Sequence, residues 1–322
     1  MLSIYPYIAG NPIDEPSGFF GRVDVLRDVN AMLRQPHKNA IVLYGQRRIG
    51  KTSVLMQLER RLAKEGQYTP VYLDLMDKAG KSLKEVLQEL ARRIHDKLNL
   101  PAPDLSLFDA EGIYFRDTFL PQAAKQAAPG GLVLLFDEFD VLDSPENGQN
   151  AGQTFFPYLR AWMNRAEGVQ FVFVIGRRPE DLSINTMSTF KGLSASQVAL
   201  LDRRDTEAII RQSEEDDGLR WTDEAVNAVW GWTQGHPFFT QLLCAAVWKE
   251  AYRDEPEETQ TVTPQMVETA VAPARIEGNN DFVWLWEGLP PAEKYVTAAI
   301  AEAEQLVISQ DDLILYFPLT GM

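Results

Sequence analysis

Residues 45–52, GQRRIGKT, have the types and spacing of a phosphate-binding loop. The apolar run before them, residues 38–45, predicts a buried strand, and the apolar positions after Gly50 recur every three or four residues, which predicts a helix ending near Gly66. Between a strand and a helix, the pattern G-x-x-x-x-G-K-[ST] turns backbone N–H groups and a helix N-terminus toward a polyphosphate. We therefore expect this loop to bind a nucleoside triphosphate.

The positions of the loop have separate expected roles. Lys51 would reach the β and γ phosphates, the Thr52 hydroxyl would ligate Mg²⁺, and Ser53 would add a secondary phosphate contact. The glycines let the backbone wrap closely and turn its N–H groups inward. The remaining expected nucleotide contacts are Gly45, Gln46, Arg47, Arg48, Ile49 and Gly50.

Two adjacent carboxylates end a second apolar run, GLVLLFDE, at residues 131–138. Asp137, at the end of a buried strand, would hold Mg²⁺ through water, and Glu138 would polarise the attacking water. A glutamate directly after the metal-binding aspartate is typical of one division of P-loop proteins. The alternative is that the acidic sequence DEFD only solvates the end of a strand.

Two arginines follow a third apolar run, residues 169–176. In the same division of P-loop proteins such a strand lies between the P-loop strand and the Asp-Glu strand, so its C-terminal end faces the γ phosphate. Arg177 or Arg178 would then sense that phosphate by a charge-assisted contact. Either arginine could instead be an ordinary surface residue.

Composition and charge narrow the classes of partner. The 322-residue chain has 31 Lys and Arg against 46 Asp and Glu, a formal charge of −15, which makes nucleic acid an unlikely partner because binding it requires clustered basic side chains. The three histidines lie too far apart for a zinc site. With no 18-residue apolar run, no signal peptide and a single cysteine, we expect a cytoplasmic protein without a membrane partner.

Alternating strand and helix patterns predict an α/β fold in which helices cover a parallel sheet. The expected strands are residues 39–44, 70–75, 132–137, 169–175 and a short one near 197–201; the expected helices are 51–65, 82–98, 113–127 and 152–166. From about residue 205 the strands stop, and the helical patterns at 205–213, 222–233, 237–252 and 263–275 predict a four-helix lid. The C-terminal part is typical of the first two helices of a winged helix.

These patterns divide the chain into three parts. We expect a P-loop NTPase core with an N-terminal adenine-side segment at 1–204, a helical lid subdomain at 205–277 and a partial winged-helix segment at 278–322.

Five separated segments form a specific combination of motifs. They are PYIAGNPIDEPSGFFGRVDVL at residues 6–26, GQRRIGKTSVL at 45–55, LLFDEFDVL at 134–142, VIGRRPEDL at 174–182 and TQGHPFFTQLL at 233–243. Together they resemble the STAND class of P-loop NTPases, near the archaeal-ATPase-type branch of AAA+-related proteins. The resemblance covers roughly residues 6–255.

The resemblance implies further contacts to the nucleotide. Five residues of the N-terminal segment would lie near the adenine or hold the chain in place before the loop; they are Tyr7, Ile8, Phe20, Gly21 and Arg22. The alternative is that Gly21 only starts a helix. The segment around His236 and Pro237 would be the lid motif that lies against the nucleotide, with His236 as the best candidate for a phosphate contact. A histidine at a helix start without a ligand role is the alternative. The preference for ATP and ADP over guanine nucleotides rests on the resemblance alone.

The leading functional hypothesis is an ATP-driven molecular switch. The core would bind ATP and Mg²⁺, the lid would close on the γ phosphate, and slow hydrolysis would reset the protein. The resemblance implies control of self-association or of a protein partner. A DNA-binding AAA+ protein of the origin-recognition or transposition-helper type is the alternative, and a scaffold that holds ADP without turnover is a third hypothesis.

Overall fold

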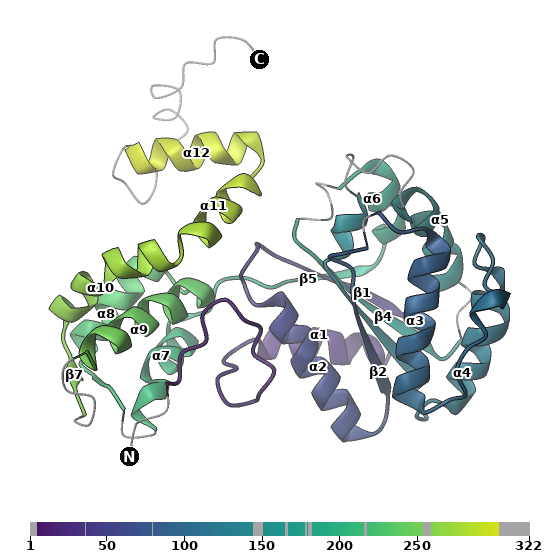
Figure 1. The fold of residues 1–322 in the computed structure, drawn as a ribbon, viewed down its shortest axis with the longest axis horizontal. Coiled ribbons are helices and arrows are strands. Elements are labelled where there is room, and N and C mark those ends of the chain that lie inside the picture. Colours follow the sequence, from purple (N-terminus) through teal and green to yellow (C-terminus); the bar gives the residue numbers. More distant parts are fainter. Residues whose placement is uncertain are drawn as a thin grey trace, which may run out of the picture.

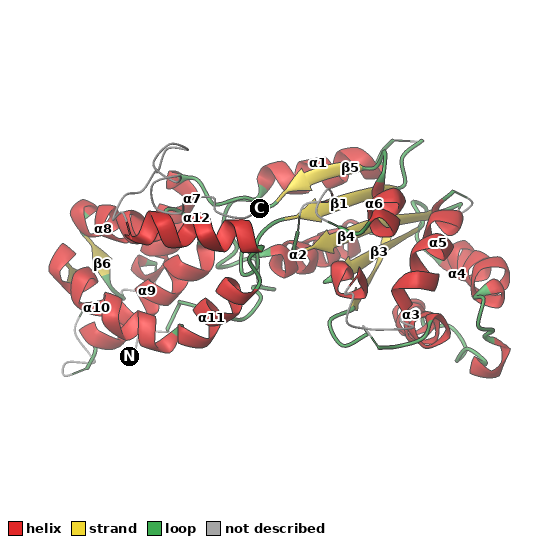
Figure 2. Cartoon of the chain, turned by 90° about the horizontal axis from the view of Figure 1, so that it is seen from above, coloured by secondary structure: helices red, strands yellow, loops and turns green. Residues whose placement is uncertain are grey.

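The computed structural model describes residues 5–35, 37–78, 80–143, 151–164, 167–177, 179, 182–215, 218–253 and 259–302. An α/β lobe and a helical lobe lie end to end, and the last two helices extend from the helical lobe (Figures 1 and 2). The predicted α/β fold with a helical lid is therefore confirmed.

The α/β lobe is built on five parallel strands in the order β2-β3-β4-β1-β5. Their bounds are β1 Ala40–Tyr44, β2 Thr69–Asp74, β3 Leu132–Asp137, β4 Val169–Ile175 and β5 Ser194–Gln197. The expected position of β4 between β1 and β3 is confirmed. The fifth strand begins before its expected start at 197, because β5 pairs with β1 from Ile41 opposite Ser194 to Tyr44 opposite Gln197.

Helices cover both faces of this sheet because successive side chains along each strand point to opposite faces. Phe171 and Phe173 pack in the core under α3 and α5, whereas Val172 and Val174 pack under α1 and α2. The helices of this lobe are α1 Val23–Leu33, α2 Lys51–Glu65, α3 Leu83–Leu98, α4 Leu120–Gln126, α5 Ala151–Met163 and α6 Ile184–Phe190.

The sequence pattern missed two details of these helices. The helix expected at 113–127 is a π-helical turn, Phe115–Phe119, followed by α4, with Pro121 in the first turn of α4. The short helix α6 was not expected. Three-residue to five-residue 3₁₀ turns also occur at Leu105–Leu107, Phe139–Asp143 and Gln212–Glu214.

The helical lobe contains the four expected helices and one unexpected ladder. The helices are α7 Arg203–Arg211, α8 Asp223–Thr233, α9 Pro237–Ala251 and α10 Pro264–Glu277. Apolar side chains surround α9, which is therefore the central helix of this lobe. The expectation that strands stop near residue 205 is wrong, because the two-residue strands β6 Arg220–Trp221 and β7 Thr261–Val262 pair in parallel. Such short strands carry no alternation that a sequence pattern could reveal.

Two helices follow the lobe, α11 Asn279–Glu287 and α12 Pro291–Glu302. The helix α11 was not expected, and its N-cap residue Gly278 provides no side-chain cap. The helix predicted to start near Ser309, and with it the rest of the winged-helix segment, lies outside the described residues. Within the ranges given above, none of the helices combines the length and the apolar character that a membrane span requires.

Candidate nucleotide site

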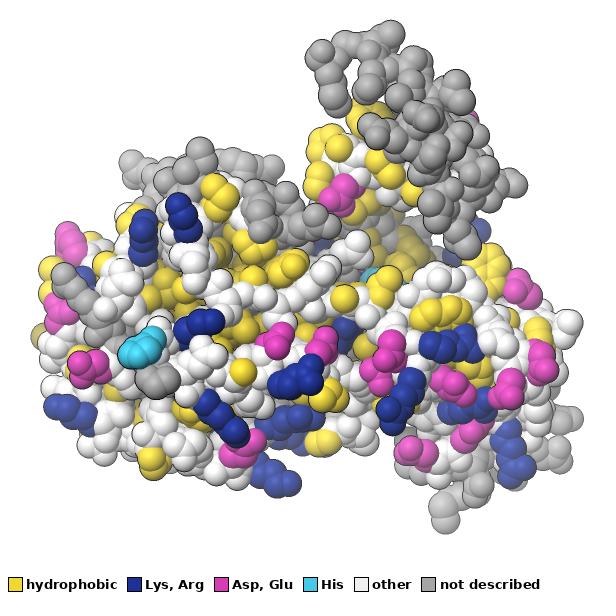
Figure 3. Space-filling view, turned by 180° about the vertical axis from the view of Figure 1, so that it is seen from behind, with side chains coloured by type: hydrophobic (Ala, Val, Ile, Leu, Met, Phe, Trp, Pro, Cys, Tyr) yellow, Lys and Arg dark blue, Asp and Glu magenta, His cyan; other side chains and the backbone are white. Residues whose placement is uncertain are grey.

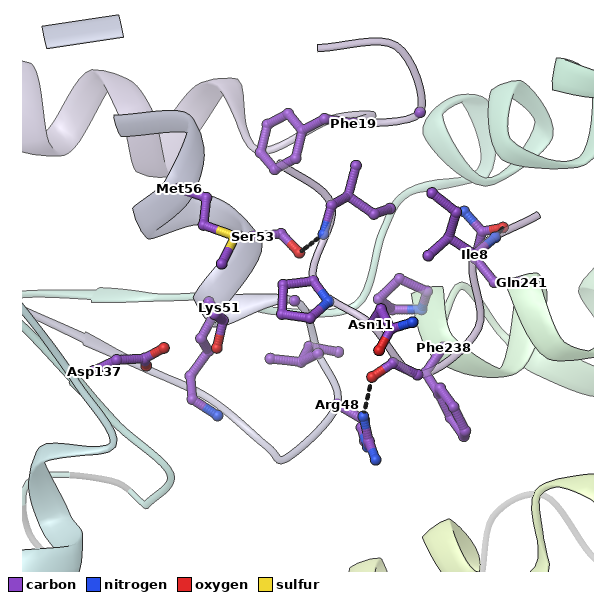
Figure 4. A pocket seen from close by; sticks show the side chains of 18 of the residues that line it. Ile8, Asn11, Phe19, Arg48, Lys51, Ser53, Met56, Asp137, Phe238 and Gln241 are labelled. Carbon is purple, nitrogen blue, oxygen red and sulfur yellow. Dashed lines mark hydrogen bonds between the residues drawn. The ribbon is translucent and has the colours of Figure 1, made fainter. Parts of the chain in front are cut away.

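A cavity of about 900 Å³ lies between the two lobes, within the size range of ligand pockets. Its wall is made by the N-terminal segment, the loop before α2 and the first turns of α2, and the ends of β2 and β3. Leu201, Ile209 on α7, the start of α9, and α11 complete it. Figure 4 shows Lys51 and Asp137 on one side of the cavity and Ile8, Phe238 and Gln241 on the other. The cavity therefore joins the phosphate loop to the helical lobe.

The glycines of the loop are required for two different reasons. Gly50, at the N-cap of α2, has φ +92°, a conformation that favours glycine, with open space where a Cβ would stand. At Gly45 a Cβ would lie 2.4 Å from the carbonyl oxygen of Val198, so packing excludes a side chain. Arg48 also has a positive φ, of 60°, which costs about 1–2 kcal/mol in a residue with a Cβ.

Lys51 places a buried ammonium group beneath the loop. Its side chain is only 5% exposed, and Nζ donates to the carbonyl oxygen of Gln46 at 2.9 Å. Burial lowers the pKa of Lys51, an effect opposed by the nearby carboxylates, of which Glu138 acts most strongly. A buried cation whose one hydrogen bond to the described residues is with a carbonyl oxygen is suited to binding an anion at the loop.

Asp137 is held by hydrogen bonds from three elements. Its carboxylate accepts from the Tyr72 hydroxyl at 3.1 Å and from the Glu138 backbone N–H at 3.0 Å, and the Thr52 side chain also hydrogen-bonds to it. Burial raises the pKa of Asp137, and the hydrogen bond with Thr52 is the largest effect that opposes this. The strand β3 thus brings its terminal carboxylate to the first turn of α2.

These oxygen donors fit Mg²⁺. Across the described part of the chain, no group of three or more His, Cys, Asp or Glu could hold a metal ion. Mg²⁺ does not need such a cage, because it commonly binds through one or two protein oxygens together with substrate phosphates and water. The adjacent oxygens of Thr52 and Asp137 meet that requirement.

Glu138 lines the cavity in a left-handed backbone conformation with φ 49°. Burial raises the pKa of its carboxyl group, and Lys51 is the main influence that lowers it. Such backbone strain costs about 1–3 kcal/mol and persists where the surrounding structure holds it, often at functional sites. Asp137 contributes to this by accepting the Glu138 N–H.

Arg177 contacts carboxylates and is not among the residues that line the cavity. Its guanidinium lies 3.5 Å from the Asp140 carboxylate and 4.0 Å from that of Asp143. Asp140 also accepts the Gly176 N–H at 3.0 Å, so it ties the end of β4 to the turn after β3. Arg178 lies outside the described residues.

The residues expected near the adenine lie in different surroundings. Ile8, Phe20 and Arg22 line the cavity, and the Arg22 guanidinium donates to the carbonyl oxygens of Ile49, at 2.8 Å, and Ala199. Burial lowers the pKa of Arg22 to about 10.

Two further expected contacts hold the N-terminal segment in place. Tyr7 lies in the core of the helical lobe, 1% exposed, and its hydroxyl donates to the carbonyl oxygen of Ile210 at 2.6 Å. It therefore anchors the N-terminal segment to that lobe and does not line the cavity. The Ser53 hydroxyl accepts the Ile13 N–H at 3.0 Å, which attaches the same segment to α2.

His236 and Pro237, at the start of α9, are placed differently from each other. Pro237 lines the cavity, whereas His236 does not; it is 6% exposed and stacks on Phe239 with 4.2 Å between ring centroids. Its Nδ1 has no hydrogen-bond partner among the described residues. Burial, and secondarily the charge of Arg22, lowers the pKa of His236 to about 4.

The helix α11 contacts the two arginines of the phosphate loop. Arg47 lies over the Trp284 ring at 4.0 Å, and Arg48 forms an ion pair with Asp281 and donates to the carbonyl oxygen of Gly10. Because Asp281 and Trp284 line the cavity, α11 forms one of its walls.

Sequence reasoning did not single out several residues of this site. Tyr72 was hidden in an apolar strand, whereas Asp140 could have been noticed as the last acidic residue of DEFD. The other missed residues are Asp281, Trp284 and Gln241. They lie on α9 and α11, and no local sequence pattern shows that these helices pack near the phosphate loop.

A family model and several solved structures are similar to most of this chain. The model of a family described as an ATPase domain predominantly from Archaea matches residues 19–240. No curated protein matches the chain. Solved structures share the fold at low identity. The Walker-type ATPase PABY2304 of Pyrococcus abyssi has a TM-score of 0.68 and 13% identity over 97% of this chain and 87% of its own.

Two other solved structures are similar over most of the chain. The Orc1 protein of Aeropyrum pernix, in complex with DNA, has a TM-score of 0.54 and 17% identity over 93% of this chain and 77% of its own. The AAA domain of FIGL-1, in complex with ADP, has a TM-score of 0.55 and 15% identity over 93% of this chain and 94% of its own. Since the family model spans more than half of the sequence, the chain belongs to the family of nucleotide-binding P-loop ATPase domains found predominantly in Archaea.

Proposed function

We propose that this ATPase is a molecular switch of the STAND class, in which the bound nucleotide sets the position of α11 relative to the phosphate loop. The observation that carries the proposal is the pair of contacts from Arg48 to Asp281 and from Arg47 to Trp284. Arg48 lines the cavity and Arg47 precedes it in the loop. The additional γ phosphate of ATP competes with Asp281 for Arg48, so the loop with ADP and the loop with ATP have different affinities for α11. Such differential affinity is what a ligand-driven switch requires.

The residues of the loop and the strand ends have proposed roles in binding and hydrolysis. Lys51 neutralises the β and γ phosphates, Thr52 and Asp137 hold Mg²⁺, and Glu138 polarises the attacking water. Bound Mg²⁺ would supply charge neutralisation between the phosphates. Arg177 senses the γ phosphate by exchanging its contact with Asp140 for a contact with the nucleotide, and turnover in the proposed switch is slow.

The proposed switch has three working parts. The core at residues 1–204 binds the nucleotide, and the lid at 205–277 contributes Pro237 and Phe238 to the cavity wall. The segment 278–322 carries the output, because α11 reports the state of the loop. Its output is self-association or binding of a protein partner.

The oligomeric state in the two nucleotide states tests this proposal. We expect the mass or the hydrodynamic radius, measured by size-exclusion chromatography with light scattering, to differ between ADP and a non-hydrolysable ATP analogue. In Asp281→Asn the two states should become alike, because the ion pair with Arg48 is lost. The matched control is Glu287→Gln on the same helix, whose ion pair with Lys294 stays within the C-terminal segment. Identical profiles of the wild-type protein with both nucleotides would refute the switch.

A DNA-binding function is the second candidate. The expectation that nucleic acid is not a partner is not supported, since the similar Orc1 structure of Aeropyrum pernix is a complex with DNA. On the face shown in Figure 3, acidic and basic side chains are interspersed, which favours the switch. The affinity for duplex DNA at several salt concentrations distinguishes the two: a slope of several units in log K against log salt supports DNA binding, and no retention supports the switch.

A further inference from the structure

Gln241 is a buried amide in the wall of the nucleotide cavity. It lies on α9, one turn after Pro237, and its side chain is 3% exposed. In Figure 4 it lies beside Ile8, on the side of the cavity opposite Lys51 and Asp137. If phosphates occupy the loop, this side of the cavity receives the other end of the nucleotide.

The hydrogen bonds of Gln241 fix which way its amide points. Its Oε1 accepts the backbone N–H of Ile8 at 3.2 Å and the side-chain amide of Gln212 at 3.2 Å. Because the backbone N–H of Ile8 can only donate, the oxygen of Gln241 faces it and the amide nitrogen occupies the other position. Among the described residues no acceptor is found for Nε2. Two N–H donors are thus left without a partner in the described part of the chain, at the cavity wall, where a ligand can accept from them.

The surroundings of this amide suit a flat heterocycle. Ile8, Pro237 and Phe238 line the same side of the cavity with apolar surface, against which a ring can pack. A purine base offers ring nitrogens that accept hydrogen bonds in its plane, which is the complement of an N–H donor between apolar walls. A ribose or a phosphate would instead leave the apolar walls facing polar oxygens.

We propose that Nε2 of Gln241 donates a hydrogen bond to a ring nitrogen of adenine, which makes Gln241 a specificity-determining residue of this ATPase. The inference rests on the proposed binding of ATP at the loop and adds the residue that selects the base. Because the same side chain also holds Ile8 and Gln212, it couples recognition of the base to the fixed position of the N-terminal segment.

Analogues of ATP that each lack one ring nitrogen test this contact. The affinities of ATP and of 1-deaza-, 3-deaza- and 7-deaza-ATP are measured by calorimetry on the wild-type protein. One analogue should bind about 5- to 150-fold more weakly than ATP, which is the range for a lost hydrogen bond that leaves a donor unpaired in the complex. If all three analogues bind as tightly as ATP, the proposal is wrong.

Two variants assign that difference to Gln241. Gln241→Met lacks the donor, and Gln241→Glu keeps only an acceptor for Ile8 and Gln212. In both variants the affinity gap, which is the difference in affinity between ATP and the weak analogue, should close. The matched control is Thr240→Val, because the Thr240 hydroxyl contacts Thr233 and the His236 carbonyl within the lobe. This control should keep the gap. A gap that persists in both Gln241 variants would overturn the assignment.

These results are separable from a failure of the proposed switch. The affinity ratios require only that nucleotide binds, whereas the switch requires that mass or shape changes with the nucleotide. A wild-type protein that binds ATP with the expected analogue gap but never changes its assembly would retain the role of Gln241 and refute the switch.

Discussion

Lowering the pH from 7 to 5 should destabilise the helical lobe through His236. The pKa of this side chain is lowered from its ordinary 6.5 to about 4 in the folded protein, mainly by burial. Between these values the unfolded chain binds more protons than the folded one, so stability falls as the pH falls. From a shift of this size we calculate a loss of about 2 kcal/mol at pH 5 and about 3 kcal/mol at pH 4. The full contribution is present above about pH 6.5.

The assay is urea unfolding at pH 7 and at pH 5, followed by tryptophan fluorescence. Six of the seven tryptophans lie after residue 220, so the emission reports mainly on the helical lobe. His236→Gln cannot take up the proton and should lose about 2 kcal/mol less than the wild-type protein between the two pH values. Thr240→Val, which also disturbs the start of α9 but adds no titratable group, should follow the wild-type pH dependence. Equal pH dependence in the wild-type protein and in His236→Gln would show that burial of this histidine has no such cost.

Three further predictions concern the phosphate end of the cavity. Lys51→Ala should abolish nucleotide binding because the phosphates lose their buried cation, and unchanged ATP affinity in calorimetry would contradict this. Glu138→Gln should bind ATP like the wild-type protein but accumulate the ATP-bound form; phosphate release at the wild-type rate would remove Glu138 from the mechanism. Replacing both Arg177 and Arg178 by Ala should reduce the preference for ATP over ADP, and an unaltered ratio of the two affinities would place the γ-phosphate sensor elsewhere.

The sequence by itself determined the phosphate loop and the strands around it. The loop is encoded locally, because eight consecutive residues provide its glycines, its cation and its hydroxyl. The strand before it and the helix after it also have clear hydrophobic patterns. Asp137 and Glu138 were found for the same reason, because they end an apolar strand. Thr52 and Asp137 were both predicted as Mg²⁺ ligands, and the structure places them in hydrogen-bond contact. Parallel strands bring their carboxyl ends to one edge of the sheet, which accounts for this contact.

Only the tertiary structure decided how the second lobe completes the site. Gln241 and Ile8 are 233 positions apart in sequence, and the contact of Arg48 with Asp281 likewise joins distant segments. Hydrogen bonds and ion pairs of this kind depend on how two lobes pack against each other, and no local periodicity encodes that packing. The same holds for His236, whose place in the sequence is typical of a ligand-binding motif but whose burial beside Phe239 results from the packing of α9. The loop proposed to bind the phosphates is therefore encoded by consecutive residues, whereas the end of the cavity proposed to bind the base exists only because the folded lobes meet there.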